Sequence, residues 1–94
     1  MMHTTLHDDG KKGRWLAYDG NKEVGLMDFV YAGTDKFIIE HTEVYEGIEG
    51  KGYGKALVQA AVDFAREKHL KIMPLCPYAK AVFDKTPAYA DVLW

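Results

Sequence analysis

A cluster of glycines in the middle of the chain constrains the fold more than any other feature of the sequence. The glycines occupy positions 47, 50, 52 and 54. An extended run from Lys36 to Tyr45 precedes them, and helical spacing over Lys55 to His69 follows directly. Glycine accepts positive φ and lets a ligand approach the backbone closely, while the first N–H groups of a helix attract anions. The order strand, glycine loop, helix therefore predicts a phosphate or pyrophosphate site at the start of this helix.

The rest of the chain predicts a sheet to which helices are added. Short extended runs separated by turn residues precede the glycine loop and favour an antiparallel meander. Residues 1–13 are polar and predict a loose arm, with or without one edge strand. Together these patterns predict a single α+β or three-layer α/β domain over residues 1–94. The expected elements are strands at 14–18, 23–32, 36–45 and 71–75, helices at 55–69 and 78–85, and a packed tail at 88–94.

Composition excludes several classes of protein. The 94 residues carry 12 basic and 14 acidic side chains, and the resulting net charge of −2 argues against nucleic-acid binding through many phosphates. No apolar run reaches the roughly 18–20 residues of a membrane-spanning helix, and the N-terminus lacks a secretory signal. Because Cys76 is the only cysteine, no disulfide within the chain can form, and a reducing cytoplasm is the simplest setting. His3 and His7 lack a third ligand, so we assign no metal.

Two common phosphate-binding loops do not fit the glycine segment. The Walker pattern requires Ser or Thr after Gly54-Lys55, where this chain has Ala56, and it requires glycine where Glu49 stands. The dinucleotide fingerprint would need its last glycine at Lys55 or Leu57. Neither of these nucleotide-binding folds is therefore supported.

The segment resembles the acetyl-CoA loop of the GNAT acetyltransferase superfamily, Arg/Gln-x-x-Gly-x-Gly/Ala. Gly52 and Gly54 fit this pattern, and Glu49 departs from it. The resemblance extends over residues 14–94 and is closest to the small single-domain, YidJ-type branch. It rests on His41-Thr42-Glu43-Val44, the glycine loop, Pro74-Leu75-Cys76-Pro77-Tyr78 and Pro87-Ala88-Tyr89-Ala90-Asp91. The fold it implies is a trimmed GNAT core: antiparallel strands, the glycine loop, a helix, a returning strand and a C-terminal helix.

The resemblance also implies the ligands. Acetyl-CoA would be the acetyl donor, coenzyme A the product, and an amine of a small molecule or a protein the acceptor. In so small a core the acceptor pocket would be small, open or completed by another chain, and the oligomeric state stays undetermined. We expect the coenzyme to be bound by Val44 on the preceding strand, by the loop residues Glu49, Gly50, Lys51, Gly52, Tyr53, Gly54 and Lys55, and by Tyr78.

Cys76 and His41 are the candidate catalytic residues. The resemblance implies that Cys76 accepts the acetyl group before it passes to the amine, a form of nucleophilic catalysis. An imidazole changes charge near neutral pH, so His41 suits a base or could activate a nearby thiol. Glu40 and Glu43 are alternative bases, while Tyr53 and Tyr78 are candidate proton donors to the departing coenzyme. On a regular strand His41 would share a face with Phe37, Ile39, Glu43 and Tyr45.

Two other functions remain as alternatives to the acetyltransferase. A module that holds acetyl-CoA or coenzyme A without turnover, such as a sensor, is favoured by the small size and by Glu49. A phosphate- or RNA-binding domain is disfavoured, because the charge is near neutral and no base-stacking motif is evident.

Overall fold

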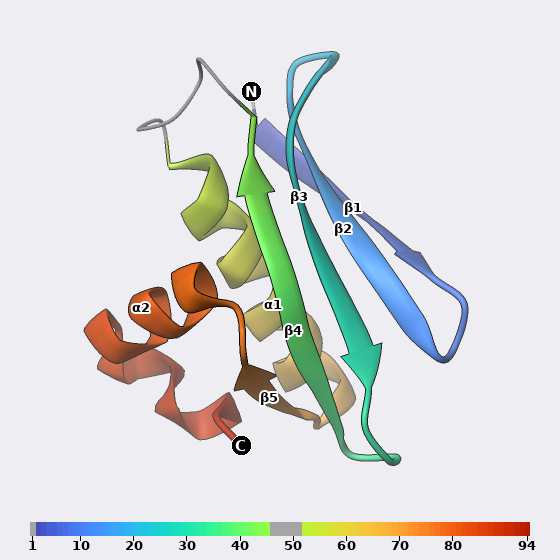
Figure 1. Ribbon diagram of the computed structural model, residues 1–94, viewed down its shortest axis with the longest axis vertical. Coiled ribbons are helices and arrows are strands. Elements are labelled where there is room, and N and C mark those ends of the chain that lie inside the picture. The colour runs from blue at the N-terminus through green and yellow to red at the C-terminus, as the bar shows by residue number, and fades with distance from the viewer. Residues whose placement is uncertain (1, 46–51) are drawn as a thin grey trace.

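The computed structural model describes residues 2–45 and 52–94, which form one five-stranded sheet with helices beside it (Figure 1). The strands follow the order β1-β2-β3-β4-β5, so each strand pairs with its neighbour in sequence. The first three pairings are antiparallel, which confirms the predicted meander, and β5 returns parallel to β4. The elements are β1 (Met2–Asp8), β2 (Lys12–Asp19), β3 (Lys22–Tyr31), β4 (Lys36–Val44), α1 (Tyr53–Lys68), β5 (Lys71–Pro74), α2 (Pro77–Lys85) and the 3-10 helix η1 (Pro87–Val92).

The N-terminal segment is an edge strand over residues 2–8 rather than a loose arm. β1 pairs with β2 from Met2 opposite Asp19 to Asp8 opposite Gly13. The turn that follows is set by local carboxylates, since the Asp8 side chain accepts the N–H of Gly10 at 2.8 Å and the Asp9 side chain accepts the N–H groups of Lys11 and Lys12 at 2.9 Å. The polar composition of residues 1–13 did not predict this strand clearly. Polar side chains are tolerated there because β1 is an edge strand that pairs with β2 alone.

One face of the sheet carries the core, and α1 covers it. Along β2 and β3, buried and half-buried side chains alternate with period two, as expected for a sheet with one covered face. Figure 1 shows α1 behind the sheet and β4 in front of it, with α2 and η1 beside the β5 edge. No helix among residues 2–45 and 52–94 covers the other face, which we call the open face. The fully buried side chains include Met27, Phe29, Phe37 and Ile39 from the sheet, and Leu57, Val58 and Val62 from α1.

A bulge in β4 changes which side chains face the core. Ile39 pairs with Phe29, but His41 pairs with Asp28, so Glu40 is an extra residue without an opposite partner. The bulge reverses the alternation, and His41 and Glu43 therefore lie on the open face with more than half of each side chain exposed. The expectation that His41 shares a face with Phe37 and Ile39 is wrong for this reason.

The strands β4 and β5 separate shortly after they pair. Their parallel register runs only from Lys36 opposite Lys71 to Ile39 opposite Pro74. The N–H groups of Leu75 and Cys76 then both donate to the carbonyl oxygen of Ile39, each at 3.1 Å. Beyond this point no described strand pairs with β4 on its β5 side, because β5 ends and the chain turns into α2.

Neighbouring residues on β4 should differ sharply in their contribution to stability. Phe37→Ala should lower the free energy of unfolding by about 3–5 kcal/mol, because it removes a fully buried ring from the helix-covered face. Ile38→Ala, on the open face, is the matched control and should cost about 1 kcal/mol. Urea unfolding followed by circular dichroism measures both, and equal losses would contradict a core confined to one face.

Candidate functional site

The helix α1 begins at a glycine in a left-handed conformation. Gly52 is its N-cap with φ of 81°, and the first helical bond runs from the Ala56 N–H to the Gly52 carbonyl oxygen at 3.0 Å. A Cβ at Gly52 would meet nothing within 4 Å, so the requirement for glycine here is conformational rather than steric. The N–H groups that precede the first helical bond have no intrahelical acceptor, which is the arrangement that binds anions. Glu49, Gly50 and Lys51 lie outside the described residues.

A second glycine brings α2 against the start of α1. A Cβ at Gly54 would lie 2.5 Å from the Tyr78 hydroxyl oxygen and 2.6 Å from the ring carbon that bears it. The absence of a side chain at Gly54 therefore lets the phenol of Tyr78 lie directly on the first turn of α1. Burial raises the pKa of Tyr78, and the nearby Cys76 raises it further when its thiol is charged, so the phenol keeps its proton at neutral pH.

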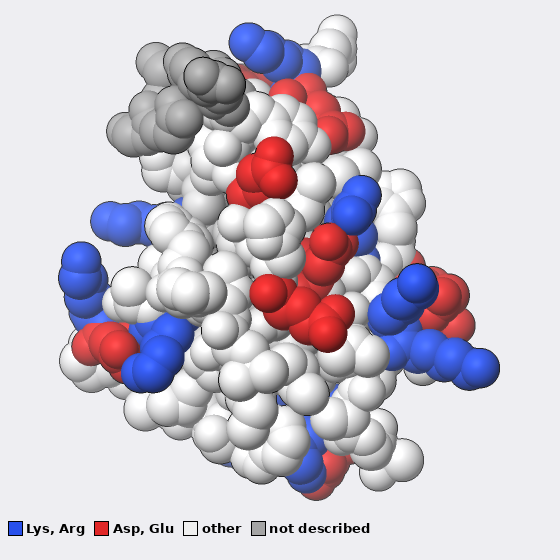
Figure 2. Space-filling view, in the orientation of Figure 1, with Lys and Arg blue, Asp and Glu red and all other residues white. Residues whose placement is uncertain are grey.

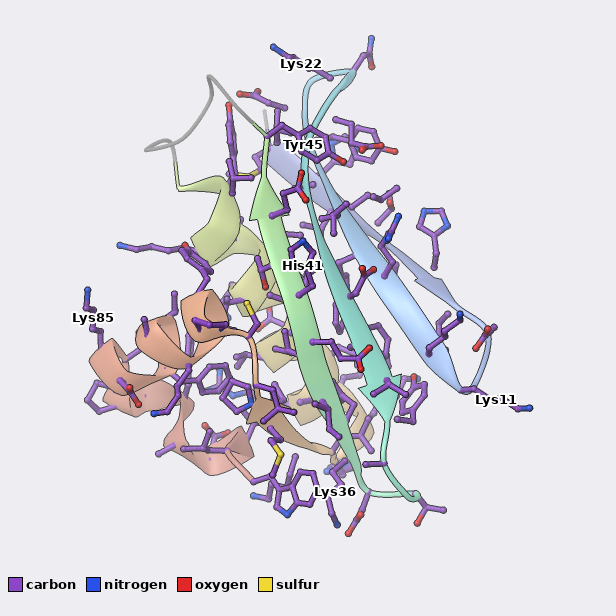
Figure 3. All side chains as sticks on the ribbon, in the orientation of Figure 1. Lys11, Lys22, Lys36, His41, Tyr45 and Lys85 are labelled. Carbon is purple, nitrogen blue, oxygen red and sulfur yellow. The ribbon has the colours of Figure 1, made fainter. Side chains whose placement is uncertain are left out.

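Two lysines border a concavity next to this contact. It has a volume of about 400 Å³ and lies between the first turn of α1 and the helices α2 and η1. Lys55 lies on the α1 side and Lys85 at the end of α2, where Figure 3 shows its side chain extending away from the helix. The remaining lining residues are Tyr78, Ala81, Val82, Thr86 and Tyr89. Cationic side chains beside a helix N-terminus suit a ligand that carries several phosphates.

Tyr53 and Val44, two more of the predicted coenzyme ligands, do not line this concavity. The Tyr53 hydroxyl donates to the carboxylate of Asp19, a contact that ties the start of α1 to the turn between β2 and β3. Val44 ends β4 opposite Gly25, with its side chain packed against the core and its strand edge beyond the end of β5.

Cys76 lies where β5 ends and α2 begins. Only 4% of its surface is exposed, and it is the N-cap residue of α2. Burial acts to raise the pKa of its thiol, but the Thr42 hydroxyl and the N–H groups of Ala79, Tyr78 and Thr42 act in the opposite direction and outweigh burial. The net effect is a thiol whose pKa lies below its ordinary value, as is typical of reactive cysteines at helix N-termini.

Thr42 was missed by the sequence analysis as a site residue. The bulge at Glu40 turns it toward the helix-covered side of the sheet, next to Cys76. Its hydroxyl oxygen is the one buried side-chain polar atom in residues 2–45 and 52–94 that lacks a partner with ordinary hydrogen-bond geometry. Threonine at position 42 was available in the sequence as part of the family motif, but nothing in its spacing indicated contact with a thiol.

His41 is not among the groups that surround the Cys76 thiol. Its Nε2 lies 3.2 Å from a carboxylate oxygen of Glu43, and both side chains are exposed on the open face. Figure 3 shows the His41 ring in front of β4, on the side of the sheet opposite α1. The structure thus groups Gly54, Tyr78 and Cys76 on one side of β4 and leaves His41 with Glu43 on the other.

Acidic side chains gather on the open face near His41, as Figure 2 shows over β3 and β4. Glu40 and Asp28 border a shallow concavity of about 560 Å³. Asp28 is paired with Arg14 at 2.6 Å, so part of the negative charge is neutralised within the protein. The other lining residues are His7, Asp8, Asp9, Lys12, Gly13 and Phe29.

Neither a metal site nor a membrane span emerges from the geometry of the described residues. Within residues 2–45 and 52–94, no three His, Cys, Asp or Glu side chains are grouped so that they could hold a metal ion. None of the described helices has the length and apolar character needed to cross a bilayer.

The chain belongs to the family of GCN5-related N-acetyl-transferases, whose family model matches residues 14–92. This match confirms the resemblance seen in the motifs. Among curated proteins, Protein NATD1 of Danio rerio is 28% identical over 81 residues, which cover 86% of this chain and 74% of that protein.

Solved structures of the family share the fold. A GCN5-like protein from Staphylococcus aureus superposes with a TM-score of 0.71 at 30% identity, covering 96% of this chain and 87% of that one. A GNAT family acetyltransferase from Elizabethkingia anophelis with acetyl-CoA bound superposes with a TM-score of 0.72 at 13% identity. The match covers 92% of this chain and 74% of that one. A ribosomal-protein-alanine N-acetyltransferase from Brucella melitensis superposes with a TM-score of 0.71 at 22% identity. The match covers 82% of this chain and 62% of that longer one. The α+β class is thereby confirmed.

The contact between Gly54 and Tyr78 predicts a change of sign in a double-mutant cycle. Gly54→Ala should lower the free energy of unfolding by about 1–3 kcal/mol, because the added Cβ would overlap the Tyr78 ring. In a Tyr78→Ala background the same substitution should instead raise it by up to about 1 kcal/mol, since alanine is the better helix former. Denaturant unfolding of the four proteins measures the cycle. Equal effects in both backgrounds would show that the two residues do not touch.

Proposed function

We propose that this chain is an N-acetyltransferase that moves the acetyl group of acetyl-CoA to an amine of a small molecule or a protein. The observation that carries this proposal is the separation of β4 from β5 beside the glycine-initiated start of α1. Membership of the GCN5-related family supports acetyl-CoA-dependent transfer in general, and the acetyl-CoA bound to the Elizabethkingia relative supports the donor. The acceptor and the part taken by Cys76 are the specific claims of the proposal.

The coenzyme would be held mainly by backbone groups and lysines. The N–H groups at the start of α1, which begins at the left-handed Gly52, suit its pyrophosphate. The loop residues Glu49, Gly50 and Lys51 are proposed to continue this contact. Lys55 and Lys85 border the concavity that would receive further phosphate charge. The free edge of β4 near Val44 would pair with the amides of the pantetheine arm, as a strand edge pairs with an extended peptide.

In the cysteine route, the Cys76 sulfur forms a bond to the acetyl carbonyl carbon while the bond from that carbon to the coenzyme sulfur breaks. The phenol of Tyr78 keeps its proton at neutral pH and lies at the start of α1, so it is suited to protonate the departing thiolate. The neutral amine nitrogen then bonds to the same carbon, and the bond to the Cys76 sulfur breaks. His41, with Glu43 beside it on the open face, would accept the proton that the amine releases, and proton exchange with water would then restore neutral His41 and the Tyr78 phenol.

Direct transfer from the coenzyme to the amine is the alternative route. It needs the same base and the same proton donor, but no bond to Cys76. The burial of Cys76 favours this alternative, because only 4% of its surface is exposed. Its lowered thiol pKa favours the cysteine route. A variant without the sulfur distinguishes the two.

Calorimetric titration should show saturable binding of acetyl-CoA and coenzyme A, with much weaker binding of ATP. Lys55→Ala and Lys85→Ala should each weaken acetyl-CoA binding about tenfold, the effect of losing one charge-assisted contact. Lys11→Ala, in the turn between β1 and β2 at the opposite end of the sheet from the start of α1, is the matched control and should bind normally. Absence of coenzyme binding in the unmodified protein would remove the proposed function, while binding without transfer to any amine would favour a sensor or binding module.

Cys76→Ala should retain acetyl-CoA binding and lose acetyl transfer. Because Cys76 is the only cysteine, intact-mass analysis of protein mixed with acetyl-CoA alone should detect one acetyl group that is removed by hydroxylamine. Cys76→Ser controls for packing, since it keeps the size of the side chain but not the reactive thiol. Unchanged transfer by Cys76→Ala would establish the direct route.

A further inference from the structure

We propose that Tyr53 is a positioning residue that holds the first turn of α1 in place for the pyrophosphate of coenzyme A, through its hydrogen bond to Asp19. This role rests on the proposed function, because the coenzyme would bind at this turn. The side chain of Tyr53 anchors the helix to the sheet, while the backbone N–H groups of the turn are left to the ligand.

The start of α1 lacks the usual local means of stabilising a helix end. Its N-cap is Gly52, which has no side chain, and its first turn contains no acidic residue. A serine, threonine or aspartate at the N-cap would accept the N–H group of the second or third helical residue, and so would occupy a donor that a phosphate needs. A glycine N-cap leaves these donors to a ligand. The helix end is then held in place only by contacts with other elements.

Tyr53 makes such a contact. It is the first residue of α1, only 6% of its surface is exposed, and its hydroxyl donates to the Asp19 carboxylate at 2.5 Å. Asp19 is the last residue of β2, at the turn that leads into β3. Hydrogen bonds from a hydroxyl to a carboxylate are short and about twice as strong as those between neutral groups. This bond therefore fixes the start of α1 relative to one end of the sheet.

The chain at the end of β4 is anchored to the same turn. The hydroxyl of Tyr45 donates to the carboxylate of Glu23, and the Tyr45 N–H donates to the Val24 carbonyl oxygen at 3.0 Å. Glu23 is the second residue of β3, directly after the turn, and Figure 3 shows Tyr45 at this end of the sheet. The hydrogen bond to a carboxylate raises the pKa of Tyr45 and of Tyr53, so each phenol keeps its proton and donates at neutral pH. The turn between β2 and β3 thus supports the chain both before and after the glycine segment.

The orientation of Tyr53 favours positioning over direct contact with the coenzyme. Its hydroxyl is bonded to Asp19, and its side chain does not line the concavity that Lys55 and Lys85 border. Contact between this phenol and the coenzyme would require the hydrogen bond to break, whereas a positioning role requires it to persist.

Coenzyme binding is compared between Tyr53→Phe and Tyr31→Phe. Each substitution keeps the ring and removes a hydroxyl that donates to a carboxylate at 2.5 Å, but Tyr31 bonds to Asp8, at the opposite end of β1 from the residue that pairs with Asp19. Tyr53→Phe should weaken the binding of coenzyme A in calorimetry about tenfold, the effect of losing one hydrogen bond to a charged group. Tyr31→Phe should bind normally. Where transfer occurs, Tyr53→Phe should raise KM for acetyl-CoA and leave kcat unchanged.

Hydrogen exchange in the free protein measures the anchor without any coenzyme. The Ala56 N–H makes the first helical bond of α1, and it should exchange about tenfold faster in Tyr53→Phe. The Leu70 N–H, which bonds to the Ala65 carbonyl oxygen after the other end of α1, is the internal control and should exchange at its original rate. Tyr31→Phe should leave both rates unchanged.

Three results would overturn the proposal. Tyr53→Phe could bind coenzyme A as tightly as the unmodified protein does, Tyr31→Phe could weaken binding equally, or the exchange of Ala56 and Leu70 could rise together. Absence of coenzyme binding by the unmodified protein would instead refute the proposed function. In that case the exchange of Ala56 still decides whether Tyr53 anchors the helix.

Discussion

The carbonyl oxygen of Ile39 accepts the N–H groups of both Leu75 and Cys76, and the arrangement of the site depends on this junction. It ends the pairing of β4 with β5, starts α2 beside β4 and fixes the backbone of the cysteine. The bulge at Glu40 follows immediately, so the strand edge is freed and the side-chain alternation changes within one residue of the junction. The start of α1 is then joined to the same region through the contact between Gly54 and Tyr78.

The two sides of β4 have different chemistry as a result. Toward α1 lie the thiol, the uncharged donors around it and the phenol, an environment of low polarity that suits a thioester. On the open face lie His41, Glu43 and the acidic side chains near Glu40, an environment that suits a cationic amine. A donor and an acceptor that approach from opposite sides of one strand would meet where β5 no longer fills the edge. His41 is therefore separated by β4 from the side on which Cys76 lies.

Most of the fold was predictable from the sequence, and the reasons for the exceptions are local. Helical spacing after the glycines gave α1 to within two residues at its start and one at its end, and turn residues separated β2, β3 and β4 correctly. The bulge was not predictable, because Ile38 and Ile39 are both apolar and either could have faced the core. The contact between Gly54 and Tyr78 joins residues far apart in the chain, and the spacing of apolar residues in the sequence does not predict such contacts. Thr42 could be recognised as a site residue only from the structure, in which it affects the pKa of Cys76.

The thiol environment also has a consequence for how folding can be followed. The groups that lower the pKa of Cys76 come from β4 and α2, and the chain between these two elements runs through α1 and β5, so the shift arises only after this long connection has closed. Contacts so distant in sequence form late and slowly compared with the hairpins of the meander. A chain in which only β1 to β4 had assembled would carry a cysteine of ordinary acidity. The pKa of the Cys76 thiol thus reports when the native structure is complete, with no dye or label required.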